Sequence, residues 1–517
     1  MTPENHNYIA LIRAAYELYP RSFRYYEQLV EYVSAPIDSS RAIFPATKVF
    51  RILNSGQRQE LTDNSIPQSY FAFIPCELRP LAPVPIIAVV EGLPSPEAIS
   101  CLGSVFCVPP ELFLGHLELG RRQVQPQRFY ELPAMPSKRQ EIIRIRTIII
   151  AKNLVSSHAG DSMEQTRKTA SADFERYERD ILKESRYGST RIRQANIHNE
   201  RILTFEQLTS IHISSDVRSP SVWRAVILLD PGKNFTQGTN SKWLEYGSQG
   251  MPLGTVPTIP ASSETYVVNS LGREHEKTNI RELHDFHPLK ISQPTDAVEL
   301  DLLYTDPFFL VSRILTAAVS SWNMLLNVIT EDISHWTTTT ATTDLDRGMQ
   351  QLCFNAGIID EVLDFVAEHA PILRAGGSPS WPSATEHSQV VRKSVLKTAL
   401  LLDISSLENR CRSLARRCKA GTSLLVSNAQ LTEAKKGIDQ ARQVQSLTKL
   451  AFIFVPAGFV SSMFGMNVAE FGGGPSIWIF FLAAVVCSSI AWAIITWGTI
   501  QTKARRLRLR SRGNISH

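Results

Sequence analysis

Two long apolar runs near the C-terminus constrain this chain more than any other feature. The first extends over residues 447–466 and carries one charged residue, Lys449, near its start, and the second extends over 477–500 and carries none. Each is long enough to cross a bilayer core as a helix, which takes about 20 apolar residues. Only residues 467–476 separate them. We therefore predict two transmembrane helices in a tight hairpin, joined by an extracytoplasmic loop at 467–476.

The charges beside the second run predict the orientation of this hairpin. Residues 503–512 contain six Lys or Arg, whereas the loop 467–476 contains none. Because basic residues next to a span stay cytoplasmic, we expect both termini inside and residues 501–517 as a basic cytoplasmic tail. A solvated or nuclear-targeting run is the alternative for these charges, but their place beside a span favours the membrane surface. The plasma membrane is the expected location, with an organelle membrane as the alternative.

Composition places most of the chain outside the membrane. It has 517 residues, of which 43% are hydrophobic, and a net charge of +5. These values indicate a large soluble part with a small membrane part at its end. Much of the positive excess lies next to the predicted spans, so we expect no nucleic-acid partner. The seven cysteines are scattered without a CxxC pair, which is typical of reduced thiols.

Residues 1–306 have the pattern of a cytoplasmic α/β domain. Helical spacing over 9–33 is interrupted by Pro20, which predicts two helices. Short β-branched runs predict strands at 85–90, 142–150, 222–229 and 266–268. The polar stretch 153–193 is expected to be a mobile loop or an exposed helix, and the stretch 230–260, rich in Gly, Pro, Ser and Thr, a long loop.

From residue 307 the pattern becomes helical. We predict a cytoplasmic helical region over 307–382, with helices at 308–336 and 345–369 and a break at 371–382. Ser383 and Glu386 have the spacing of a capping box and predict a helix start. The next proline is Pro456, so 383–446 is expected to be a long stalk helix that continues into the first span, 447–466. At about 1.5 Å per residue, stalk and span would extend over more than roughly 100 Å. The predicted fold class is an α+β membrane protein.

Residues 464–467, Phe-Gly-Met-Asn, resemble the Gly-Met-Asn signature of the CorA family of magnesium channels and transporters, which usually reads Tyr-Gly-Met-Asn-Phe. The surroundings are similar as well: Leu-Thr at 447–448, Pro456, a second span about ten residues after the motif and a basic tail. The specific match covers about 383–512. The helix at 322–327, Trp-Asn-Met-Leu-Leu-Asn, is similar to the divergent CorA-like proteins of fungi.

The resemblance implies a homopentamer with a funnel-shaped cytoplasmic α/β domain. The first span of each subunit would line a central pore, the second would pack outside it, and Gly465, Met466 and Asn467 would form the selectivity filter. The implied activity is Mg²⁺ influx driven by the membrane potential and gated by cytoplasmic Mg²⁺. Mg²⁺ would thus be both the transported ion and a regulatory ligand. The implied partners are divalent cations, the lipid bilayer and further copies of the same chain.

The residues themselves support a pore on two grounds. Two helices cannot enclose a water path, so a channel made from this hairpin needs a closed ring of subunits. One face of the first span carries mostly small residues at a spacing of 4, 3, 4 and 3: Ala451, Val455, Gly458, Ser462 and Gly465. Such a face suits either a pore wall or close helix packing. Together with the signature, we interpret it as pore-lining.

Asn467 suits the chemistry of Mg²⁺, which holds its water tightly. A neutral amide can donate to and accept from bound water without trapping the ion by charge. Asn467 is also a suitable residue to end a helix, because Asn tolerates the left-handed conformation. Both roles are compatible.

The loop after the motif departs from the family pattern. It holds a single acid, Glu470, where many members have several, although five copies would still form a ring of carboxylates at the mouth. This departure puts the uptake rate and ion selectivity in doubt. The regulatory metal site cannot be assigned from the sequence, and its candidate acids are Asp296, Glu299, Asp301, Asp306, Glu331, Asp332, Asp360, Glu361 and Asp364.

No motif supports an enzyme. The sequence has no GxxxxGK[ST], GxSxG or HExxH pattern. A zinc site is conceivable where histidines and acids gather, but their spacing fits no standard ligand pattern: Glu274, His275, Glu282, His284, Asp285 and His287. The alternative function is a membrane-anchored cytoplasmic interaction or scaffold protein without transport, which the long N-terminal region without a family motif and the single acid in the loop would suit. The signature and the small-residue face favour transport over this alternative, because an anchor needs neither.

Overall fold

The computed structural model describes most of the chain up to residue 465 and parts of the segment beyond it. The described residues are 3–18, 24–34, 46–53, 57–60, 84–118, 140–152, 163–183, 187–199, 202–216, 219–231, 254–256, 297–338, 345–465, 478–479, 481–490, 492–493 and 496–497. The predicted strand 266–268, the histidine and acid group at 274–287, the loop 467–476 and the tail 501–517 lie outside them. The chain divides into two compact units, Met1–Thr422 and Ser423–His517.

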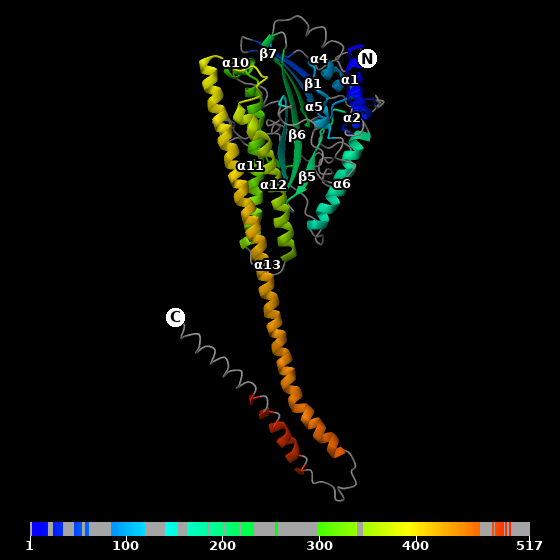
Figure 1. Ribbon diagram of the computed structural model, residues 1–517, viewed down its shortest axis with the longest axis vertical. Helices are drawn as coiled ribbons and strands as arrows, with labels where there is room; N and C mark the ends of the chain where they lie inside the picture. The colour runs from blue at the N-terminus through cyan, green and yellow to red at the C-terminus, as the bar shows by residue number, and fades with distance from the viewer. Residues whose placement is uncertain are drawn as a thin grey trace, which may run out of the picture. The chain divides into compact units, whose positions relative to one another are not determined.

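The first unit is built around a mixed eight-stranded sheet of order β2-β1-β3-β7-β6-β4-β8, with β5 paired to β6 beside this path (Figure 1). Its strands are β1 (Ala46–Leu53), β2 (Gln57–Glu60), β3 (Ile86–Glu91), β4 (Ile142–Lys152), β5 (Gln194–Ile197), β6 (Ile202–Asp216), β7 (Ser219–Leu229) and β8 (Gly254–Val256). Among these strands only β3 and β7 pair in parallel. The strands predicted at 85–90, 142–150 and 222–229 are confirmed.

Helices from the first half of the chain cover one face of the sheet. They are α1 (Pro3–Leu18), α2 (Arg24–Ser34), α4 (Pro96–Phe106), α5 (Pro110–Leu117) and α6 (Met163–Lys183). The two helices predicted within 9–33 are confirmed, with Pro20 itself outside the described residues, and the helical option for 153–193 is confirmed over 163–183. Their apolar faces share one core with β3 and β7. In this core the ring of Tyr8 packs where a side chain on Gly103 would lie, and its hydroxyl donates to the carbonyl of Val108 at 2.7 Å.

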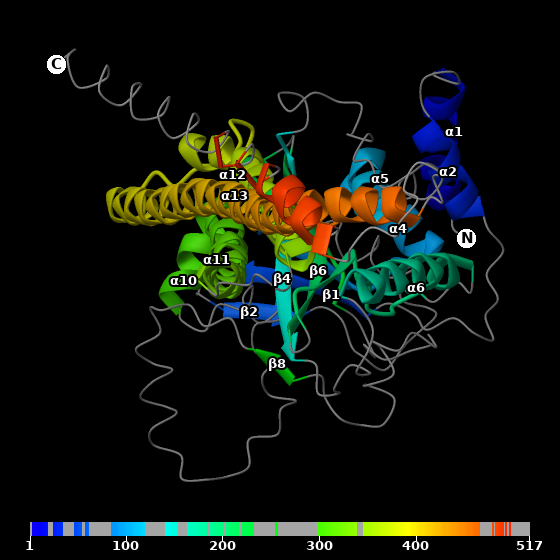
Figure 2. The ribbon, with the colours of Figure 1, turned by 90° about the horizontal axis from the view of Figure 1, so that it is seen from below.

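The other side of the sheet carries α10 (Ala297–Thr305), α11 (Phe308–Thr338) and α12 (Leu345–Ala375) (Figure 2). Part of the outer edge of β4 is closed by side chains from two of these helices. Trp322 Nε1 donates to the carbonyl of Arg146 at 3.0 Å, and the amide of Ile148 donates to Ser321 Oγ at 3.1 Å. His369 Nε2 lies 2.9 Å from the carbonyl oxygen of Arg144. Edge groups that would otherwise be open to another strand are therefore occupied, and α11 and α12 are attached directly to the sheet.

α12 extends further than its sequence pattern predicted. We expected it to end at residue 369 because of Pro371, but the helix continues through this proline to Ala375. It ends at Gly376 and Gly377, which both have positive φ and donate to the carbonyl of Ile372. Glycine adopts this conformation without steric cost, so the glycine pair and not the proline ends the helix.

α13 (His387–Gly465) is a single helix of 79 residues. The predicted capping box is wrong: the helix begins at His387, and Ser383 Oγ instead contacts Asp306 Oδ2 at 3.3 Å. The helix passes residues 446 and 447 without a break, so the predicted stalk and first span form one element. The division between the two units falls inside it, after Thr422.

Two helices among the described residues are long and apolar enough to cross a membrane, Phe308–Thr337 and His387–Met463. They differ in burial, because 67% of the apolar window of the first is buried but only 6% of that of the second. The first is α11, the core helix attached to β4. A shorter apolar helix, Phe481–Ile490, lies in the second predicted span.

Candidate functional site

The predicted pore-lining face lies at the C-terminal end of α13. Its five residues, Ala451, Val455, Gly458, Ser462 and Gly465, all belong to this helix and are exposed. The phenylalanines beside this face are exposed too, with Phe454 at 65% and Phe459 at 68%. Nothing within the described part of one chain covers either set, so the segment is apolar all round and open. This is the character of a helix whose partners are lipid or other copies of the chain.

The signature itself is only partly described. Gly465 is the last residue of α13, and a side chain added there would meet nothing within 4 Å. Met466, Asn467 and Glu470 lie outside the described residues, so their roles stay predictions. Pro456 lies inside α13. A proline there removes one backbone hydrogen bond, which favours a local bend.

The short helix in the second span has two unlike faces. Ala483, Ala484, Cys487 and Ser488 are half-buried, whereas Leu482, Val485, Val486 and Ile490 are exposed. Small residues toward protein and large apolar residues outward are typical of a helix packed in a bilayer. The pattern supports the membrane interpretation of 477–500 for the described residues.

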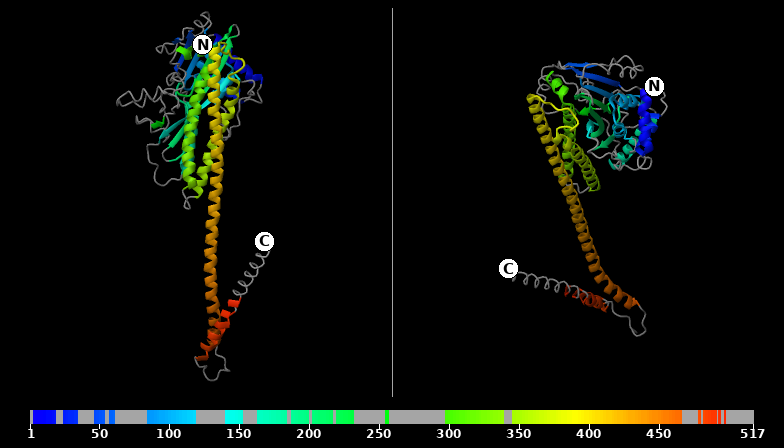
Figure 3. Two further views of the ribbon diagram at one scale, coloured as in Figure 1. Left: turned by 90° about the vertical axis from the view of Figure 1, so that its left-hand side faces the viewer. Right: turned by 45° about the horizontal axis from the view of Figure 1, so that its top comes forward.

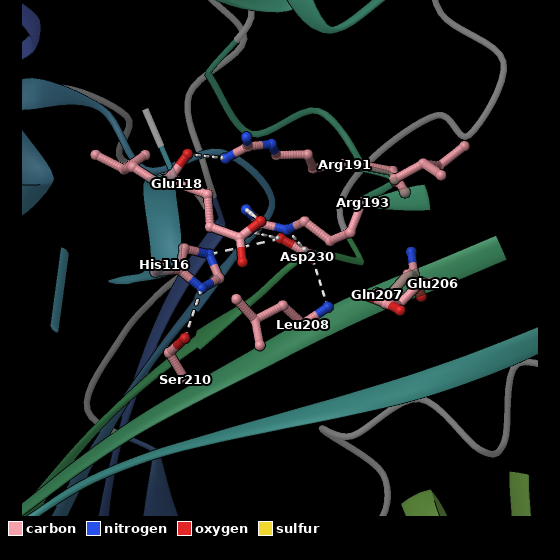
Figure 4. Close-up of polar contacts among 12 residues, drawn as sticks. His116, Glu118, Arg191, Arg193, Glu206, Gln207, Leu208, Ser210 and Asp230 are labelled. Carbon is pink, nitrogen blue, oxygen red and sulfur yellow. Dashed lines mark hydrogen bonds and ion pairs between the residues drawn. The ribbon is translucent and has the colours of Figure 1, made fainter. Parts of the chain in front are cut away.

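A second polar site lies inside the first unit, where β5 and β7 share one edge of β6. β5 pairs with residues 203–206 of β6 and β7 with residues 209–216, so a gap separates the two strands. Asp230, directly after β7, and Arg193, directly before β5, meet at this gap (Figure 4). The Arg193 guanidinium binds Asp230 with both contacts at 2.6 Å. The Asp230 carboxylate also accepts the amide of Leu208, which lies between the two paired stretches.

Further charges surround this ion pair. Arg191 donates to the carbonyl of Leu117 at 2.7 Å. Arg146 on β4 binds Glu118 at 2.7 Å and also pairs with Glu206. The three arginines are matched by the three carboxylates of Glu118, Glu206 and Asp230. This balance lets the ions stay buried, because an unpaired charge in a protein interior costs several kcal/mol.

One corner of this site has the residue types of a catalytic triad. His116 Nδ1 lies 3.0 Å from Ser210 Oγ, and its Nε2 lies 3.6 Å from Asp230 Oδ1. Burial, with Arg193 and Arg191 nearby, lowers the pKa of His116 well below its ordinary value, so the ring is neutral. All three side chains are at most 2% exposed, and Asp230 is already bound by Arg193. Without access for a substrate the arrangement is structural, and it fills the gap between β5 and β7.

Sequence reasoning did not single out any of these charged residues. The available signals were Arg-Ile-Arg at 191–193, at the start of a strand, and Asp230 directly after the apolar run 225–229. Neither indicates a partner, because the interacting groups come from five separate segments of the chain.

The candidate regulatory acids have varied surroundings. Asp306 is fully buried and occupied: it accepts from the amides of Phe308 and Ala384 at 2.9 and 3.2 Å and from Lys393 Nζ at 2.6 Å. Asp332 Oδ2 accepts hydrogen bonds from the side-chain amides of Gln351 and Asn355. Asp306 thus caps the start of α11 and connects it to the start of α13, and Asp332 on α11 accepts hydrogen bonds from α12.

The other candidates are mostly surface residues. Asp301, Glu331, Asp360 and Asp364 are exposed, with Asp301 accepting from Gln389 at 3.0 Å, and Glu361 is half-buried beside Gln194. Asp296 and the side chain of Glu299 are not among the described groups. Within the described part of the chain, three or more His, Cys, Asp or Glu side chains do not gather anywhere in a way that could hold a metal ion.

Comparison with known proteins identifies the C-terminal part. Residues 304–497 match the family model described as CorA-like Mg²⁺ transporter protein. Over this segment the chain is similar to the CorA-like Mg²⁺ transporter proteins. The match begins at the end of α10 and includes α11, α12, α13, the Gly-Met-Asn signature and most of both apolar runs. It thus starts well before residue 383, where the sequence resemblance began.

Two further comparisons complete this picture. A search of curated proteins gave no significant match. Among solved structures, the CorA magnesium transporter from Methanocaldococcus jannaschii aligns over 87% of this chain and 97% of its own, with 11% identity and a TM-score of 0.34. The CorA-like assignment therefore rests on the family model over residues 304–497.

Proposed function

We propose that this protein conducts Mg²⁺ across a membrane in the manner of a CorA-type channel. The observation that carries the proposal is the family match over 304–497, which spans both apolar runs and the signature at the end of α13. The exposed apolar surface of α13 beyond Lys449 supports it, because such a surface needs lipid or other helices around it. Magnesium is the expected cargo, and other divalent cations are candidates.

In this proposal the subunits form a homopentamer. A ring is needed because a two-helix hairpin cannot enclose a path for water. Ala451, Val455, Gly458 and Ser462 would line the pore, and Gly465 would let the backbone turn toward the filter. Asn467 would present a ring of amides to hydrated Mg²⁺, and Glu470 a ring of carboxylates at the mouth.

The driving force is the membrane potential. With both termini in the cytoplasm, an ion moving from loop to tail side carries two charges inward. Each charge gains about 2.3 kcal/mol per 100 mV, so Mg²⁺ gains roughly twice that. Such a transporter needs no chemical energy source.

Regulation by cytoplasmic Mg²⁺ is part of the proposal. Asp306 and Asp332 are engaged in contacts within the subunit and are poor ligands for a dissociable ion. The exposed acids Glu331, Asp360 and Asp364 are better placed to meet a neighbouring subunit. A regulatory ion bound between subunits would draw on these, each subunit contributing part of the coordination shell.

The test is Mg²⁺ influx into liposomes that contain the full-length protein, with an inside-negative potential and low internal Mg²⁺. We expect uptake by the wild type and a loss of at least tenfold in Asn467→Ala. Asn428→Ala is the matched control, because Asn428 lies exposed on α13, outside both predicted spans. Equal uptake by all three would exclude Asn467 as the filter, and no uptake by the wild type would refute transport.

A membrane-anchored scaffold is the second candidate. The family match begins only at residue 304, so the sheet and its first five helices lie outside it. A cytoplasmic domain of that size could bind partners without any transport. Wild-type liposomes that show no uptake would favour this function.

A further inference from the structure

The first part of α13 runs beside α11 and α12 (Figure 3). It contacts them through a regular row of buried, mostly apolar side chains, the apolar seam. Its buried residues recur at alternating steps of four and three: Leu400, Ile404, Leu407, Cys411, Leu414, Cys418 and Gly421. This is a heptad pattern, in which the same residue types return every seven positions. A shift of α13 by seven residues would superpose leucine on leucine at several places. The apolar seam by itself therefore leaves the axial position of α13 open.

Arginines reinforce the seam without resolving this ambiguity. Arg410 donates to Asn323 Oδ1 at 2.6 Å, to Asn327 Oδ1 at 2.5 Å and to Thr330 Oγ1 at 3.3 Å. Arg417, one heptad further on, donates to Ser334 Oγ at 2.8 Å. In the register shifted by one heptad, Arg417 would take the place of Arg410. The two arginines thus stabilise the pair of helices but fit more than one position.

Gly421 is the residue that distinguishes the registers. A Cβ atom at this position would lie 2.9 Å from Thr337 Cγ2 and 3.0 Å from Leu352 Cδ1. Real Cβ atoms hardly approach so closely, so any other residue at this position would require the side chain of Thr337 or Leu352 to shift. A shift by one turn or one heptad would bring Cys418 or Leu414 into this space. Such one-turn shifts are a known type of conformational change, with steps of about 5.4 Å.

We propose that Gly421 is a positioning residue that sets the register of α13 against α11 and α12 within the first unit. This inference rests on the proposed transport function for its consequence, but the register itself is a property of the first unit. Arg410 strengthens the contact, and the Lys393–Asp306 pair holds the start of α13 in the same register.

A matched set of glycine variants tests the proposal in the full-length protein. Gly421→Ala adds one methyl group at the crowded position, whereas Gly437→Ala adds it on the same helix where nothing lies within 4 Å. Both changes raise helix propensity equally, so only the steric effect differs. Thr337→Ser in the Gly421→Ala background removes Cγ2 and keeps the hydroxyl that donates to the carbonyl of Ile333.

Hydrogen–deuterium exchange of the reconstituted protein reports how firmly α13 is held against α11 and α12 in this register. We expect Gly421→Ala to raise exchange in peptides covering 330–338 and 404–422 by at least tenfold, and Thr337→Ser to reverse part of this rise. Gly437→Ala should leave both regions unchanged. Equal behaviour of the two alanine variants would overturn the proposed register role of Gly421.

Transport separates positioning from simple stability. With Mg²⁺ influx as readout, Gly421→Ala should shift the internal Mg²⁺ concentration that halves the influx by at least threefold, while maximal influx stays within twofold of the wild type. A fall in maximal influx with an unchanged half-point would mean a purely structural role and overturn the inference. Wild-type liposomes without influx would instead refute the proposed function, whereas wild-type influx with no effect of Gly421→Ala would refute this inference alone.

Discussion

The two parts of α13 have the same backbone conformation for different reasons. Residues 387–422 form a seam of buried side chains and make polar contacts to α11. In residues 423–465 nearly every described side chain is exposed, including Leu431 at 61% and Leu447 at 65%. The first part is stabilised by packing within its own chain. The second needs a bilayer or further copies, because a lone exposed helix gains little from tertiary packing.

The glycines follow the same division. A Cβ atom at Gly421 would require Thr337 or Leu352 to shift, whereas additions at Gly437, Gly458 and Gly465 would meet nothing within 4 Å. An exposed glycine costs a helix about 1 kcal/mol relative to alanine. Among the described residues, no contact within this chain explains the three glycines of the second part.

Asp306 should show the largest effect on stability. Asp306→Ala leaves the Lys393 ammonium without its partner and removes the cap of α11, which we expect to cost about 3–5 kcal/mol of unfolding free energy. Asp306→Asn keeps hydrogen bonding to the amide of Phe308 and should cost less. Chemical unfolding of the full chain in detergent, followed by tryptophan fluorescence, measures both. Similar losses for both variants would mean that the ion pair with Lys393 matters and the cap does not.

Truncating a leucine in each part of α13 tests the comparison directly. Leu414 is 3% exposed and Leu431 is 61% exposed. Leu414→Ala should cost about 2–5 kcal/mol because it leaves a cavity in the seam, whereas Leu431→Ala should change the unfolding free energy of a dissociated subunit by less than roughly 0.5 kcal/mol. The same unfolding assay applies. A large loss for Leu431→Ala in the dissociated subunit would break the comparison.

The two alanine-for-glycine changes should have opposite signs. Gly421→Ala forces a methyl group against Thr337 and Leu352 and should destabilise the chain by about 1–3 kcal/mol. Gly437→Ala should stabilise it by up to about 1 kcal/mol through helix propensity. Thermal unfolding midpoints give the sign of each. If both variants were stabilised, the close packing at Gly421 would be wrong.

The smallest expected difference in unfolding free energy is between alanine substitutions of two neighbouring arginines, Arg410 and Arg412. Arg410→Ala removes contacts to three residues of α11 and should cost about 1–2 kcal/mol. Arg412→Ala removes only an exposed pair with Glu408, four residues earlier on the same helix, and should cost less than about 0.5 kcal/mol. Chemical unfolding midpoints of the two variants are compared side by side. A larger loss for Arg412→Ala would contradict the contact between α11 and α13.

Local patterns predicted much of this fold. The helical spacing of 308–336 and 345–369 indicated α11 and most of α12, and the β-branched runs indicated β3, β4 and β7. The same patterns missed β6, the longest strand, because its sequence mixes polar residues such as Glu206, Gln207 and His212 with apolar ones. All three side chains are buried, and Glu206 and His212 face partners from distant segments, Arg146 and Glu141, about which a local pattern carries no information.

The sequence by itself determined the two apolar runs, the long uninterrupted helix that contains the first of them and the resemblance to CorA, since each depends on residues adjacent in the chain. Only the tertiary structure decided that Asp306 is buried and bonded to Lys393, and that Arg193 and Asp230 pair in the gap beside β6. It also decided that Gly421 lies where a side chain would press against Thr337 and Leu352. The physical reason is the same in all three cases. Burial and pairing depend on which distant segments meet, and that meeting is a property of the whole fold.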